Sequence, residues 1–337
     1  MKSSWLFHAL VLTLAATGAL SPVARLVDAS QQLQTLTFSS FSVPLEITVA
    51  RELSLFTREG IDLQSSQVPN STQQLQQLMD LETGIVTTAA DNLVYWNEDR
   101  GADFLIFMVG AGRLDQNFYV RPEIQTYDDL RGGVLAVDSA SSGYATVLRA
   151  ILARNGLSVG QDVRFEEVGN TGARTEALVD GRVVGSMLGE GQVSFIAQAE
   201  AAGVHVLARG ADYMPVYPSG TYATTRRWAA DNPQLMVGFV RAVIGARNWL
   251  RDPSNADAAV AMAARVYTLN ENQARAQYRS AVDELGAPTI DAQVRTDMLQ
   301  AIADMRVETG LLEPPAPSAS KYVTPNWYQL AQQSMSR

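Results

Sequence analysis

Residues 134–154 constrain the fold most, because they read as a buried strand that leads directly into an amphipathic helix. The run 134–137 is uninterruptedly apolar, as in strands that are buried on both faces. From Tyr144 the apolar residues recur with a helical period, and Asn155-Gly156 is typical of a helix C-terminus. The loop between them carries three serines and a glycine. This loop either only caps the helix, through Ser141 or Ser142, or also binds a polar or anionic ligand.

Strand and helix patterns alternate along the chain in two blocks. Buried strands are predicted at 33–38, 61–64, 85–90 and 104–109, and again at 134–137, 163–168, 183–188 and 204–208, with helices between them. Short strand-like runs stand at 117–121 and 221–225, and the chain is mostly helical from residue 232 onward. This pattern predicts an α/β protein with parallel sheets covered by helices.

In open α/β sheets, ligands bind at the carboxyl ends of the strands. Applied to this chain, the rule selects five loops that each follow a predicted strand: 39–43, 89–92, 139–144, 170–172 and 189–192. We therefore expect a binding site where these loops meet.

Composition narrows the class of protein. The chain has 337 residues, 47% of them hydrophobic, and a net charge of −9, which suits two globular domains and disfavours nucleic acid as a partner. Cysteine is absent, which excludes disulfides, thiolate metal sites, a cysteine nucleophile and a lipidated N-terminal cysteine.

The N-terminus reads as a cleavable signal peptide over residues 1–29. Lys2 is followed by an apolar stretch at 5–20, and 27–29 is a small-x-small cleavage site, with an earlier alternative at 21–24. An uncleaved anchor is the alternative, although the apolar run is short for a spanning helix.

Side chains for catalysis are scarce. Beyond the predicted signal peptide the only histidine is His205, inside a predicted strand, and no phosphate loop, dinucleotide motif, nucleophile elbow or histidine metal motif occurs. The sequence therefore predicts no catalytic residue, no metal site and no cofactor. Among carboxylates near strand ends, Asp91 reads as a helix cap and Asp138 as a strand-end residue. Glu190 is either a solvated loop residue or a ligand contact.

Four stretches resemble one known family. They are residues 41–63, which include the run FTREGIDL; 127–138, with the turn DLRGG; 177–190; and 224–250. In order and spacing they are similar to the periplasmic solute-binding proteins of the nitrate, sulfonate, taurine and pyrimidine-precursor group, called SsuA/THI5-like or NMT1-like. The chain departs from the family pattern at Gly133, at Gly185-Ser186 and by lacking a proline after Glu190.

The resemblance implies a type II periplasmic-binding fold, with two α/β lobes and a ligand cleft between them. Lobe one would comprise 30–115 plus 220–337, and lobe two 116–219. It also implies a monomeric periplasmic receptor, without nucleic-acid partners, that closes on a small solute and delivers it to an ABC permease in the inner membrane. A pyrimidine-synthase-like enzyme and a non-transporting sensor are the alternatives.

The strand-end loops and this resemblance together give the candidate ligand contacts. They are Ser39, Phe41, Ala90, Asp91, Asn92, Asp138, Ser139, Ser141, Ser142, Gly143, Tyr144, Glu190 and Tyr213. The loops 39–43, 90–92, 138–144 and 188–192 contain no arginine or lysine, which favours a neutral or amine-bearing solute such as a pyrimidine-like heterocycle over nitrate or a sulfonate. Arg113 or Arg174 would reverse this preference by pointing into the cleft.

Overall fold

The computed structural model describes residues 33–189, 191–286, 294–324 and 326–335. The predicted signal peptide and Glu190 lie outside the described residues.

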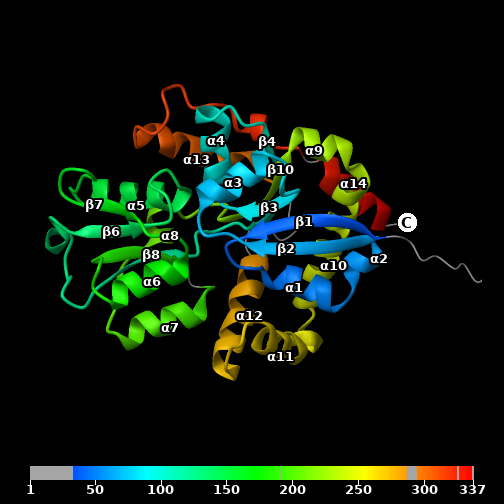
Figure 1. The fold of residues 1–337 in the computed structure, drawn as a ribbon, viewed down its shortest axis with the longest axis horizontal. Helices are drawn as coiled ribbons and strands as arrows, with labels where there is room; N and C mark the ends of the chain where they lie inside the picture. The colour runs from blue at the N-terminus through cyan, green and yellow to red at the C-terminus, as the bar shows by residue number, and fades with distance from the viewer. Residues whose placement is uncertain (1–32, 190, 287–293, 325, 336–337) are drawn as a thin grey trace, which may run out of the picture. The chain divides into compact units, whose positions relative to one another are not determined.

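The first sheet has five strands in the order β2-β1-β3-β10-β4. They are β1 (Gln34–Ser40), β2 (Ile61–Gln67), β3 (Ile85–Thr88), β4 (Phe104–Ala111) and β10 (Gly220–Thr225). Strand β1 runs parallel to β2 and β3, whereas β10 is antiparallel to both of its neighbours. Figure 1 shows α3 (Ser71–Met79) and α4 (Ala90–Asp99) on one side of this sheet, and α1 (Leu45–Glu52) and α10 (Pro233–Arg251) on the other.

The second sheet has the order β7-β6-β8-β5-β9. Its strands are β5 (Gln116–Val120), β6 (Val134–Val137), β7 (Arg164–Glu167), β8 (Gly185–Gly189) and β9 (His205–Arg209). Here β6 is parallel to β7 and β8, and β5 is the antiparallel strand. In Figure 1, α5 (Gly143–Arg154) lies on one side of the sheet, and α6 (Thr171–Val179) and α7 (Val193–Ala201) lie on the other.

The remaining elements are mostly helices of the C-terminal part. They are α2 (Leu55–Arg58), α8 (Gly210–Tyr213), α9 (Arg226–Asp231), α11 (Ala256–Val266), α12 (Glu271–Gly286), α13 (Thr296–Glu308) and α14 (Asn326–Met335), with short 3-10 turns at Asp128–Leu130, Pro253–Asn255 and Ala319–Tyr322. Among the described residues, no helix is both long and apolar enough to span a membrane.

The two sheets with flanking helices confirm the predicted α/β class. The prediction of parallel sheets is wrong at β10 and β5, because each of these strands runs antiparallel to both of its neighbours. The helical segment between β1 and β2 is interrupted, because Ser54 has a left-handed backbone (φ 56°) that separates α1 from α2. Pro44 itself is the N-cap of α1. The predicted C-terminus of α5 is confirmed, since Asn155 caps the helix and Gly156 has a φ of 75°.

Apolar side chains on both faces of the first sheet explain its helical cover. Phe38 of β1 and Phe107 of β4 pack against Phe239 of α10, with ring centroids 6.1 and 6.2 Å apart. On the opposite face, Trp96 of α4 packs against Phe104. The Phe38 contact lies near the end of β1, where the predicted binding loop 39–43 begins.

Candidate functional site

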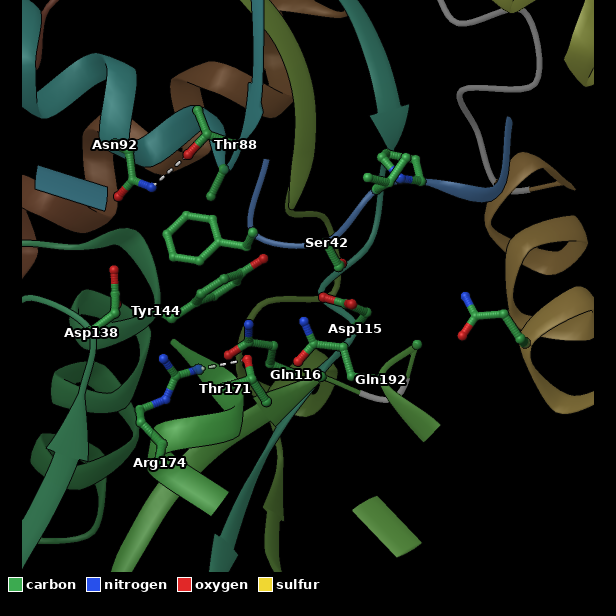
Figure 2. Close-up of a pocket in the computed structure, with 17 residues that line it drawn as sticks. Ser42, Thr88, Asn92, Asp115, Gln116, Asp138, Tyr144, Thr171, Arg174 and Gln192 are labelled. Carbon is green, nitrogen blue, oxygen red and sulfur yellow. Dashed lines mark hydrogen bonds between the residues drawn. The ribbon is translucent and has the colours of Figure 1, made fainter. Parts of the chain in front are cut away.

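Loops from both sheets line one cavity of about 170 Å³. Figure 2 shows the side chains that project into it. The lining consists of Phe41, Ser42, Val43, Pro44, Thr88, Ala89, Asn92, Asp115, Gln116, Asp138, Tyr144, Thr171, Arg174, Gly189, Gly191, Gln192 and Gln277. All five loops selected by the strand-end rule contribute at least one of these residues.

Asp115 and Gln116 line the cavity although they lie at the beginning of a strand, β5, and not after the end of one. Strand β5 is antiparallel to β8, and Gln116 is the register partner of Gly189. The start of β5 therefore lies at the same sheet edge as the carboxyl end of β8. The sequence predicts a strand-like run only from residue 117 onward, and neither residue is among the candidate contacts.

Arg174 brings a buried positive charge to the lining. Arg174 lies on α6 and is 4% exposed. Its side chain donates hydrogen bonds to the carbonyl oxygens of Gly169 (2.6 Å) and Met187 (3.3 Å) and to Oγ1 of Thr171 (3.1 Å). Burial lowers the pKa of Arg174, and the nearby Asp138 carboxylate opposes that change. Arg113 is absent from this lining. The four loops contain no arginine or lysine, but Arg174 lines the cavity from helix α6. Arg174 therefore meets the condition under which the preference for a neutral or amine-bearing solute over an anion is reversed.

Asp138 and Asn92 each form a hydrogen bond, beside the cavity, between a segment next to one sheet and a segment next to the other. Asp138 follows β6, and its Oδ2 accepts the backbone N–H of Ser71 on α3 (3.1 Å). Asn92 on α4 donates to Oγ1 of Thr88 (2.9 Å) and accepts the N–H of Gly143 at the start of α5 (2.7 Å). These bonds fix the orientation of both side chains.

Asp91 forms a buried ion pair away from the cavity lining. Arg306 of α13 donates from Nε to its carboxylate, and both side chains are fully buried. Burial raises the pKa of Asp91, while the Arg306 charge and hydrogen bond oppose the rise. Helix α4 begins at Ala90 with Ala89 as its N-cap, so the prediction that Asp91 caps the helix is wrong. The pairing partner, 215 residues further on, is invisible to local sequence patterns.

The serine loop that opens α5 is occupied by protein contacts. Ser142 is the N-cap and accepts the N–H of Ala145 (3.3 Å), which confirms the capping interpretation. Ser139 bonds to Ser141 through their hydroxyls and accepts from Thr72. The carbonyl of Ser141 accepts from Arg306 (3.0 Å). Only Tyr144 of this segment lines the cavity, and its hydroxyl donates to the carbonyl of Ser219 (3.3 Å).

Three other candidate contacts lie outside the lining. Ser39 is buried at the end of β1, and its carbonyl accepts from Gln74. Ala90 is buried and donates its N–H to the carbonyl of Pro218. Tyr213 bonds through its hydroxyl to Tyr127 (3.1 Å) and Asn155 (2.9 Å), at the far end of α5. Of the described candidates, the cavity brings together Phe41, Asn92, Asp138 and Tyr144.

A second cavity of about 330 Å³ shares part of the first one's lining. The residues common to both are Phe41, Ser42, Val43, Thr171, Gly191, Gln192 and Gln277. The second cavity adds apolar side chains from Val193 and Phe195 of α7 and from Val266, Tyr267 and Leu269 at the end of α11 and beyond it. It also adds the polar side chains of Gln67, Asn170 and Ser194. Among the described residues, no group of three or more histidines and carboxylates is placed to hold a metal ion.

The fold is that of solved periplasmic binding proteins. The alkanesulfonate-binding protein SsuA from Xanthomonas axonopodis pv. citri, bound to MOPS, superposes with a TM-score of 0.69 at 18% identity, covering 87% of this chain and 98% of its own. The nitrate-binding protein NrtA from Synechocystis PCC 6803 gives 0.74 at 11% identity, covering 90% and 89%. The chain therefore has the two-lobe α/β fold of this class.

The model of the NMT1-like family matches residues 113–264, which confirms the predicted resemblance over that part of the chain. An enzyme also shares the fold: the desulfurization enzyme DSZB gives a TM-score of 0.61 at 17% identity, covering 90% of this chain and 99% of its own. No curated protein sequence matches the chain.

Proposed function

We propose that this protein is an extracytoplasmic solute-binding receptor that captures a small organic solute and delivers it to an ABC permease. One observation carries the proposal: loops from two separate sheets line a single partly enclosed cavity. A solute there contacts both sheets at once, so binding favours the conformation in which they are close. The fold shared with ligand-binding components of transport systems and the NMT1-like match support this assignment.

The proposal includes the division of the chain. Lobe one comprises 30–115 plus 220–337 and lobe two comprises 116–219, since β5 and β10 begin close after these boundaries. Residues 1–29 are a signal peptide, so the mature protein begins near Ser30 and is periplasmic. N-terminal sequencing of the protein from a periplasmic extract tests this point, and a start at Met1 would contradict it.

Native mass spectrometry of the protein purified without denaturation tests the receptor function. We expect one small molecule per chain, and the same molecule should stabilise the fold in a thermal-shift panel of amines, pyrimidines, sulfonates and nitrate. The molecule should leave chemically unchanged. Release of an altered product would instead establish an enzyme, the alternative that the DSZB fold keeps open.

Transport and sensing differ in the protein that receives the loaded receptor. We propose transport, so reconstituted vesicles that hold the cognate permease should take up the solute only when the receptor is present. Solute-dependent docking on a membrane receptor without uptake would support the sensor.

A further inference from the structure

We propose that the solute carries a carbamoyl group, –CO–NH₂, as in a primary amide or a urea. In the smaller cavity its two N–H groups donate to Gln116 and Gln192, and its carbonyl oxygen accepts from Arg174. This inference rests on the proposed receptor function and specifies the substrate class of that site.

Two buried amide oxygens without donors provide the first evidence. Gln116 is 6% exposed and lines the smaller cavity, and its Oε1 is buried and receives no hydrogen bond from the described residues. The Oε1 of Gln192, in the same lining, is buried and also lacks a donor within the described part of the chain. Figure 2 shows both labelled side chains in the close-up of the cavity. Because a buried polar group without a partner is costly, a solute that supplies these two donors gains affinity.

Several other polar side chains of the same lining already have partners within the protein. Asn92 both donates and accepts hydrogen bonds, the Tyr144 hydroxyl donates to a carbonyl, and Asp138 accepts a backbone N–H. Asp115 also has an interaction within the chain. The two glutamine oxygens therefore stand out as the acceptors that a solute has to satisfy.

Arg174 provides the donors that complement these acceptors. A guanidinium has five N–H groups. Three hydrogen bonds run from the Nη atoms of Arg174 to Gly169, Thr171 and Met187, so that Nε–H and one Nη1–H have no acceptor among the described residues. Arg174 alone would suit an anion, but the oxygen atoms of an anion give no donor to Gln116 or Gln192.

A carbamoyl group matches this set of donors and acceptors one for one. Its NH₂ offers two donors for the two glutamine oxygens, and its carbonyl oxygen has two lone pairs for Arg174. An ammonium group has donors but no acceptor, and nitrate or a sulfonate has acceptors but no donor. Turning a glutamine amide by 180° exchanges the buried acceptor for a buried donor, and a carbamoyl group matches that orientation too.

NMR titration with butyramide, butyrate, 2-pentanone and butylamine tests the head group, because these four probes share a propyl chain. 2-Pentanone keeps the carbonyl without the N–H donors, butyrate replaces the donors by a charge, and butylamine lacks the acceptor. We expect one butyramide per chain, bound at least about fivefold more tightly than any of the other three probes.

Gln116→Met removes the amide at nearly constant side-chain length. It should weaken butyramide binding about fivefold and hardly change 2-pentanone binding, because only butyramide donates to this residue. Gln192→Met, at a less buried position, should have the same effect and provides the test if Gln116→Met does not fold. The matched control is Gln161→Met, at an exposed position after α5, which should leave both affinities unchanged.

The results separate this inference from the receptor proposal. Butyramide that does not bind, or that binds more weakly than butyrate or butylamine, would overturn the carbamoyl assignment. Equal losses for butyramide and 2-pentanone in the glutamine variants would do the same. A native solute without a carbamoyl group, released unaltered, would also overturn the assignment but leave the receptor function intact. A solute released chemically altered would overturn the receptor function itself.

Discussion

Two buried arginines near the loops between the sheets are held in opposite ways. Arg306 of α13 forms an ion pair with Asp91, donates to the carbonyl of Ser141 and lies 4.9 Å from the ring centre of Tyr95. Arg174 of α6 has three neutral oxygen acceptors, and its nearby carboxylate, Asp138, lies beyond ion-pair distance. Of these two arginines, only Arg174 lines one of the two cavities.

The difference separates a structural charge from one that a ligand meets. The charges of Arg306 and Asp91 neutralise each other where both side chains are buried. The hydrogen bonds of Arg306 connect α13 with α4 and with the loop before α5. Removing one partner there leaves the other charge buried and alone. Arg174 borders space that a solute or water reaches, so its loss is partly compensated by solvation.

The largest expected effect is at the buried pair. Arg306→Met should lower the free energy of unfolding by about 3–5 kcal/mol, since the Asp91 carboxylate is left without its counter-charge. Urea denaturation measures the loss. The double variant Asp91→Leu/Arg306→Met should recover most of it, and a loss below about 1 kcal/mol in the single variant would contradict the structural assignment.

Gly143 and Gly191 differ in the space available for a side chain. A Cβ at Gly143, beside the ion pair, would lie 2.4 Å from the Tyr217 hydroxyl and 2.8 Å from Cβ of Asp91. Gly143→Ala should therefore cost about 1–3 kcal/mol of stability. A Cβ at Gly191, at the cavity, would come no closer than 3.9 Å to the Ser280 hydroxyl. Gly191→Ala should change stability by less than about 0.5 kcal/mol in the same denaturation experiment. Equal losses would refute the contrast.

Arg174→Met should destabilise the protein less than Arg306→Met. The carbonyls of Gly169 and Met187 lose donors, but water in the cavity replaces part of the lost bonding, so we expect a loss of about 1–2 kcal/mol. Chemical denaturation of both variants side by side measures the difference. A larger loss for Arg174→Met would show that Arg174 is the main structural charge.

The smallest effect concerns Glu98, at the opposite end of α4 from Asp91. Burial alone would raise the pKa of Glu98, but hydrogen bonds from Lys321 (2.6 Å) and Tyr322 (2.7 Å) outweigh it and hold the pKa below its usual value. Its stabilising contribution is therefore present at neutral pH and is lost as the pH falls through the folded-state pKa. Glu98→Gln should reduce stability at neutral pH by less than about 1 kcal/mol. Denaturation midpoints of the two proteins should converge in acid, and a gap that persists there would contradict this account.

Features set by neighbouring residues were predictable from the sequence. The strand, the Ser142 cap and the Asn155-Gly156 terminus around α5 depend on contacts within a few residues. The five strand-end loops also reached the cavity, because parallel strands bring their carboxyl ends to one edge.

Features that depend on residues far apart in the sequence were not predictable from the sequence. The role of Asp91 depends on Arg306, and Gln116 reaches the site only because β5 runs antiparallel to β8. Arg174 enters from a helix face, and Gln277 comes from α12, long after the last strand. No local pattern marks such residues as cavity residues.

A crystal structure of the protein with the solute recovered from native purification tests the central claim most directly. We expect one unaltered molecule in contact with loops of both sheets. A molecule bound outside the two cavities, or found there as a reaction product, would contradict it.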